Sequence, residues 1–166
     1  MELPGAGYFY ALATISMAFV GFTAIVVVLR QGMGKKLLPL HVLFTSVFVE
    51  LGLMATAFAM LAPTLAICGI REHLVWQISS AIMLAVLVPW LLTYPKRRKT
   101  AAPKEPLPLR WYVMTTLGTG VVVALCLNVV GLVISPGPGP LAAAAVYVLS
   151  YASVAFFGTY TSFVRG

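Results

Sequence analysis

Five long apolar runs, separated by short polar segments, constrain this chain more than any other sequence feature. They cover residues 8–29, 40–62, 74–94, 111–134 and 141–164. A helix of about 20 apolar residues crosses a hydrocarbon layer about 30 Å thick, so each run is long enough to span a membrane once. With 61% hydrophobic and 9% charged residues, the composition is not that of a soluble domain. We predict an all-α, polytopic integral membrane protein, a single domain over residues 1–166 built as a bundle of five transmembrane helices.

The basic residues predict how these helices are oriented, because cytoplasmic loops of membrane proteins carry an excess of Lys and Arg. If all five runs cross, only Arg71 of the eleven basic residues lies on one side. The other ten share the opposite side: Arg30, Lys35, Lys36, Lys96, Arg97, Arg98, Lys99, Lys104, Arg110 and Arg165. We therefore expect the N-terminus outside, the C-terminus in the cytoplasm and a basic cytoplasmic loop over residues 95–110. The expected location is a multi-pass position in a bacterial inner membrane.

Glu50 is the acidic residue that lies well inside an apolar run, ten residues after Leu40 and therefore roughly at mid-membrane. A carboxylate at that depth costs about 2.5–3.5 kcal/mol and normally faces other helices or water, often along an ion pathway. Ser46, one helical turn away, is its predicted hydrogen-bond partner. Hydroxyl groups from other runs are expected at the same depth and are further candidates for ion binding: Thr119, Tyr151 and Ser153.

The charge state of Glu50 leaves two alternatives open. No Lys or Arg of this chain is expected at its depth, so an ionised Glu50 would need a bound cation, a water-filled cavity or a charge from a partner subunit. Otherwise it stays protonated and holds helices together through serine or threonine, an effect of order 1 kcal/mol. A proton relay from His41 is not favoured, because about 13 Å of helix separates His41 from Glu50.

Small residues recur in the first two runs at helical spacing, a pattern typical of membrane helices that approach each other closely. The first set begins at Gly7, just before the first run, and continues with Ala11, Thr14, Ala18 and Gly21; the second run carries Thr45, Gly52, Thr56 and Ala59. We predict helix packing through Ala18, Gly21, Gly52 and Thr56. Because five short helices are not expected to bury all these positions alone, a homo-oligomer or a complex with other membrane subunits is expected.

The basic cluster Lys96, Arg97, Arg98 and Lys99 is expected in the loop after Tyr94. Such a cluster beside a membrane attracts anionic lipids by about 1 kcal/mol per side chain, and it is also a possible contact for a partner protein. Nucleic acid is not an expected partner, because the chain has no room for a folded basic domain.

The residue types needed for catalysis or metal binding do not come together in this sequence. The chain has no Asp, and no two acids are expected at one depth. His41 and His73 belong to opposite membrane faces, so they do not form an axial pair for haem. Binding of a haem through a single ligand, or of a haem shared with a partner, remains an alternative. Cys68 is expected in an outer loop and Cys126 about 12 Å deeper, too far for a disulfide. We expect no enzyme, no metal site and no cofactor of the chain's own.

Two functions remain after these exclusions. The first is a small oligomeric channel or carrier for a cation or proton, with Glu50 in the pathway. The alternative is a non-catalytic accessory or scaffold subunit that packs into a larger membrane protein complex.

Overall fold

The computed structural model describes residues 3–32, 39–103, 109–131 and 135–164, with side chains for all of these except 27, 30–32, 40–41 and 158–164. Within these ranges the secondary structure is entirely helical, and each helix contains a stretch long and apolar enough to cross a membrane. The helices are α1 (Ala6–Gly32), α2 (Pro39–Ile67), α3 (Glu72–Ala101), α4 (Leu109–Val130) and α5 (Pro138–Val164). The prediction of an all-α membrane protein with five spans is confirmed.

Proline and glycine mark several helix ends. Pro39 and Pro138 begin α2 and α5, where the fixed φ of proline suits the first turn and its missing N–H costs nothing. Gly69 and Gly131 follow the ends of α2 and α4 with φ of 78° and 65°. This left-handed conformation is one that glycine adopts without steric cost, and it stops the helix.

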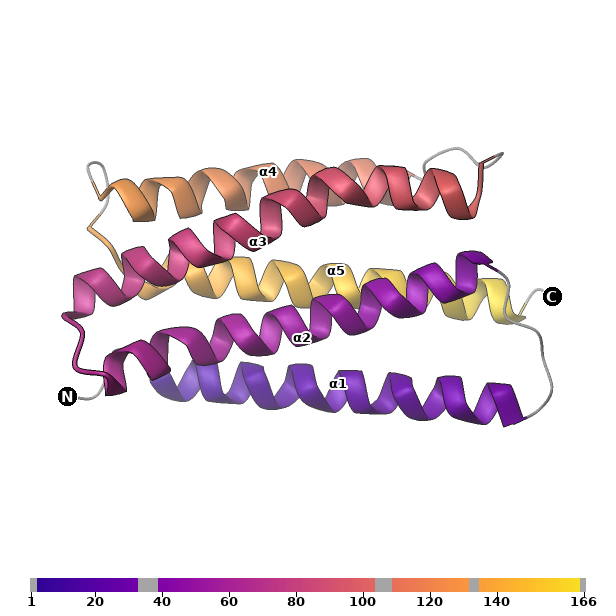
Figure 1. The fold of residues 1–166 in the computed structure, drawn as a ribbon, viewed down its shortest axis with the longest axis horizontal. Coiled ribbons are helices and arrows are strands. Elements are labelled where there is room, and N and C mark those ends of the chain that lie inside the picture. Colours follow the sequence, from indigo (N-terminus) through magenta and orange to yellow (C-terminus); the bar gives the residue numbers. More distant parts are fainter. Residues whose placement is uncertain (1–2, 33–38, 104–108, 132–134, 165–166) are drawn as a thin grey trace.

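The helices lie side by side along one axis, with each helix antiparallel to the next in the chain (Figure 1). Helix α1 begins at one end of the bundle and α5 finishes at the other. Contacts run from α2 to α3, α3 to α4, α4 to α5 and α5 back to α2, while the described backbones of α2 and α4 do not come within 8 Å of each other between Cα atoms. The last four helices therefore form an antiparallel four-helix bundle, and α1 lies on its outside, mainly against α2.

Helices α1, α2 and α3 all extend beyond the ends of their predicted spans, α1 by reaching Gly32. Helix α2 continues through Pro63 to Ile67, and α3 continues through Pro89 and Pro95 to Ala101. Each proline removes one backbone hydrogen bond without ending the helix, as membrane helices tolerate. The helices therefore do not end at residues 62 and 94, where the predicted spans end. The basic cluster at residues 96–99 consequently lies on the last turns of α3 and not in a loop.

In α2, Gly52 is one of the predicted small residues and lies at a close approach to α1. Gly52 is buried against α1, and a Cβ atom at this position would overlap the side chain of Val20. Ala59, two turns along the same face, is also buried. Thr56 is half-buried between them and donates its hydroxyl to the Gly52 carbonyl at 3.0 Å. Close approach of α1 and α2 thus depends on the absence of a side chain at Gly52.

The small residues predicted to pack on α1 are not the ones that α1 buries within the chain. Its buried residues are Phe9, Leu12, Ala13, Ser16 and Thr23. Ala18 and Gly21 are exposed, and a Cβ atom on Gly21 would meet no described residue within 4 Å. Within the described chain, these two positions therefore do not pack against another helix, because a different face of α1 is turned toward α2. Contact of this face with another subunit stays a prediction.

Candidate functional site

Glu50 of α2 forms an ion pair with Arg97 of α3. The Nη1 atom of Arg97 donates to Oε2 of Glu50 at 2.6 Å, and Nη2 donates to Oε1 at 2.7 Å. Two parallel N–H···O bonds of this kind are the strongest arrangement between a guanidinium and a carboxylate. The side chains are 34% and 36% exposed, so the pair is neither fully buried nor fully solvated.

The expectation that no basic side chain reaches Glu50 is wrong, for reasons of helix length and direction. Because α3 continues to Ala101, Arg97 is still part of the helix that packs on α2. Side chains in an α-helix lean toward the helix N-terminus. In the antiparallel pair α2 and α3, Glu50 leans toward the start of α2 and Arg97 leans back from the end of α3. The two side chains therefore extend toward each other along the bundle axis, so they meet although the two residues lie at different depths.

Ser46 and Trp90 complete the coordination of the Glu50 carboxylate. Ser46 Oγ donates to Oε1 at 2.7 Å, which confirms the predicted partner, and it accepts a bond from Arg97 Nη2 at 3.2 Å. Trp90 Nε1 donates to Oε2 at 3.1 Å. Each carboxylate oxygen thus accepts two hydrogen bonds, and one guanidinium balances its charge. We call Glu50, Arg97, Ser46 and Trp90 the charged cluster.

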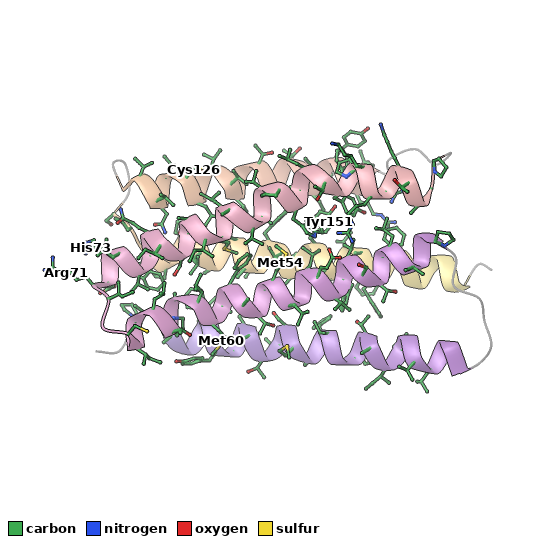
Figure 2. The ribbon with its side chains drawn as sticks, viewed as in Figure 1. Met54, Met60, Arg71, His73, Cys126 and Tyr151 are labelled. Atoms are coloured by element: carbon green, nitrogen blue, oxygen red, sulfur yellow. The ribbon has the colours of Figure 1, made fainter. Side chains whose placement is uncertain are left out.

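Tyr151 of α5 approaches the charged cluster through an aromatic contact. Trp90 stacks on Tyr94 with ring centroids 5.5 Å apart, and the buried ring of Tyr151 meets Trp90 edge-on at 5.4 Å. Figure 2 shows Tyr151 on α5 between the other helices. These contacts hold the Trp90 indole in place, so that its N–H points at Glu50. Tyr151 therefore positions a partner of Glu50.

The structure does not bring Thr119 or Ser153 to Glu50. Thr119 is exposed on α4 and donates to the Thr115 carbonyl at 3.0 Å, while Ser153 donates to the Leu149 carbonyl at 3.0 Å. In a helix, a serine or threonine hydroxyl readily bonds the carbonyl four residues back. Equal depth in the membrane was thus not enough to predict contact with Glu50, because the rotation of each helix also decides which way its side chains point.

The four basic residues at the end of α3 divide into two pairs. Arg97 belongs to the charged cluster, and Arg98 is 6% exposed with its guanidinium over the ring of Phe44 at 5.8 Å. Lys96 and Lys99 are exposed. The predicted contact with lipid or a partner was made for all four residues. Arg97 and Arg98 face the bundle instead. Lys96 and Lys99 are therefore the two exposed side chains of the four that could make this contact.

Sequence reasoning did not select Asn128, which anchors a second polar cluster at the opposite end of the bundle. Its Nδ2 donates to Ser80 Oγ at 2.8 Å and to the Gly137 carbonyl at 3.2 Å, and its Oδ1 accepts from Gly137 N at 2.9 Å. Gln77 Nε2 adds a bond to the Val129 carbonyl at 3.0 Å. We call these residues the amide cluster. The sequence signal that could have identified Asn128 was a carboxamide inside the apolar run 111–134, since such groups commonly form hydrogen bonds between membrane helices.

Other reactive side chains lie apart from both clusters. Cys68 and Cys126 are free and exposed, and Figure 2 shows Cys126 on the outer side of α4. Arg71 and His73 lie near the start of α3 (Figure 2). The side chain of His41 lies outside the described residues. In the described part of the chain, no three His, Cys, Asp or Glu residues gather as a metal site would require.

Comparison with known proteins adds no relative. A scan of protein-family models, a search of curated proteins and a search of solved structures each find no match to this chain. Its function is therefore inferred from the charged cluster, the amide cluster and the exposed helix faces.

Proposed function

We propose that this chain is a non-catalytic helical subunit that packs into a larger membrane protein assembly. The observation that carries the proposal is the coordination of Glu50, whose carboxylate is balanced by Arg97 and bonded by Ser46 and Trp90. A carboxylate with its charge balanced inside the chain needs no bound cation. The charged cluster then serves to hold the end of α3 against α2.

The exposed face of α1 supports the same proposal. Ala11, Thr14, Ala18 and Gly21 are all exposed on this helix. Lipid chains fill a face of small residues less well than a second helix does, and membrane helices often associate through such faces. The proposed partner is a second copy of the chain or another membrane subunit.

Transport of a cation or proton is the second candidate, and partial exposure of the ion pair favours it. Ionisable residues inside a membrane span often mark ion pathways, and Glu50 and Arg97 are each about one-third exposed. In this function Arg97 would release Glu50 when a proton or cation binds. The candidates thus differ in whether the pair opens during function.

For both candidates we propose that the basic end of the bundle faces the cytoplasm. This end contains the start of α2, the end of α3 and the start of α4. The N-terminus is then outside and the C-terminus inside, as the positive-inside rule requires. A bacterial inner membrane is the proposed location.

Flux measurements on reconstituted protein separate the two candidates. Liposomes with a pH- or cation-sensitive dye inside would contain the wild type, Glu50→Gln, Arg97→Gln or Lys96→Gln. Lys96→Gln is the matched control, because it removes one positive charge from an exposed neighbour of Arg97. The subunit proposal expects all four to match empty liposomes, and expects the wild type to copurify with stoichiometric membrane proteins or with itself. Wild-type flux that Glu50→Gln abolishes and Lys96→Gln preserves would establish transport instead.

A further inference from the structure

A small pocket at the basic end of the bundle lies outside the charged cluster. It has a volume of about 20 Å³ and is lined by residues of α2, α3, α4 and α5. Its polar and aromatic lining comprises Phe44, Tyr94, Arg98, Arg110, Trp111 and Tyr151. A volume of this size holds one water molecule or one oxygen atom of a larger group. The remainder of any ligand would therefore lie at the mouth of the pocket.

The lining of this pocket favours an anion. Arg98 enters from the last turn of α3 and is held over Phe44, while Arg110 enters from the first turn of α4 and is exposed. Among the described residues that line the pocket, two carry a positive charge and none is a carboxylate. A guanidinium presents several N–H donors in one plane, an arrangement that matches the oxygens of a phosphate.

The position of the pocket places it at the level of lipid headgroups. Helix α3 has 30 residues and is about 45 Å long, against about 30 Å for the hydrocarbon layer, so its last turn reaches the interface. Trp111 and Tyr94 suit this level, since their rings have an apolar body and a polar edge. Lys96 and Lys99 are exposed nearby on α3 and add positive charge to the same surface.

We infer that this pocket binds the phosphate of an anionic phospholipid headgroup. One phosphate oxygen enters between Arg98 and Arg110, and the acyl chains lie along the outer face of α4. That face is apolar where it leaves the pocket, because Val113 and Leu117 are exposed one turn beyond Arg110 and Met114. A free phosphate would use the two arginines alone, so the adjoining apolar face assigns the pocket to a lipid.

Native mass spectrometry of the purified full chain tests this inference, with dioleoylphosphatidylglycerol as the anionic probe and dioleoylphosphatidylcholine as the zwitterionic one. We expect the wild type to bind the anionic lipid more tightly. Arg110→Gln should weaken that binding about fivefold, which corresponds to about 1 kcal/mol. Arg110→Lys should restore most of the affinity, because it retains the charge. Arg71→Gln, which removes an exposed arginine at the opposite end, should leave affinity unchanged.

Three results would overturn the inference. The first is equal binding of the two lipids by the wild type, and the second is an equal loss of affinity in Arg110→Gln and Arg71→Gln. The third is inorganic phosphate binding as tightly as the anionic lipid and with the same dependence on Arg110, which would assign the pocket to a soluble anion. Because Arg110 is exposed, its substitution leaves the helix packing intact, and far-ultraviolet circular dichroism of each variant checks this. The inference is independent of whether the Glu50–Arg97 pair opens.

Discussion

The charged cluster and the amide cluster both join α3 to its neighbours, yet they satisfy polar groups in different ways. At the basic end, a full ion pair connects α3 to α2 and is about one-third exposed. At the opposite end, Asn128 connects α3 to α4 and to Gly137 before α5, and it is 1% exposed. Removing two charges from water costs several kcal/mol per ion, whereas a fully bonded amide avoids that cost. The fold thus leaves the ion pair partly exposed and buries the neutral amide.

The two clusters hold different parts of α3, with Gln77 and Ser80 near its start and Trp90 and Arg97 toward its end. Ser80 and Arg97 are separated on α3 by about 25 Å of helix, and Pro89 lies between them. A proline inside a helix interrupts the backbone hydrogen bonds and allows a bend. The ends of α3 therefore need separate attachment. Substitutions in the two clusters distinguish an attachment by charge from one by neutral hydrogen bonds.

Arg97→Gln is the substitution with the largest expected effect. It removes the positive charge that balances the Glu50 carboxylate inside a membrane span. Of the present hydrogen-bond donors to the carboxylate, only the neutral groups of Ser46 and Trp90 are left. We expect a loss of about 3 kcal/mol of unfolding free energy, at the lower end of the range for broken buried pairs because this pair is partly exposed. Denaturant titration in mixed micelles, followed by circular dichroism, measures it.

Two comparisons sharpen this result. Lys96→Gln changes the same charge on an exposed neighbour and should stay within about 0.5 kcal/mol of the wild type. The double variant Glu50→Gln with Arg97→Gln should be more stable than Arg97→Gln alone, because it leaves no unbalanced charge. If Arg97→Gln were as stable as Lys96→Gln, the charged cluster would contribute no attachment.

Asn128→Leu is expected to have an intermediate effect. It removes the bonds to Ser80 and to both backbone groups of Gly137, which we expect to cost about 1–2 kcal/mol in a membrane protein. This loss should not change between low and high salt, whereas the Glu50–Arg97 coupling from a double-mutant cycle should decrease with salt. Cys126→Leu, on an exposed position of the same helix, is the control. Equal salt dependence in both clusters would refute the distinction between them.

Trp90→Phe is the smallest expected change. It removes one of four donors to Glu50 and keeps a ring that can stack on Tyr94, so about 0.5 kcal/mol is expected. Thr93→Ala, an exposed position on the same helix, provides the control in the same unfolding titration. A loss as large as that of Arg97→Gln would mean that the indole N–H, and not the guanidinium, stabilises the carboxylate.

The bond between Ser46 and Glu50 could be predicted because both residues lie on one helix, four positions apart. Helical geometry alone places such side chains together. The bond from Arg97 could not be predicted in the same way. It depends on α3 continuing past Pro95 and on two antiparallel helices facing each other at these positions.

The glycines of the first two helices show the same limit. Gly21 and Gly52 belong to similar small-residue patterns, but Gly52 lies against Val20, while no described residue comes within 4 Å of the missing side chain of Gly21. A pattern of small residues indicates that close approach is sterically allowed. It does not indicate which face of the helix is turned toward a neighbour.

The sequence by itself determined the class of protein and the five spans. These properties follow from the length of each apolar run, because the free energy of burying a segment in lipid is largely a sum over its own residues. Only the tertiary structure decided that Arg97 pairs with Glu50, that Asn128 bonds Ser80, and that Thr119 faces outward. The rotation of each helix about its axis depends on all the side chains packed against it at once, and these come from segments far apart in the sequence.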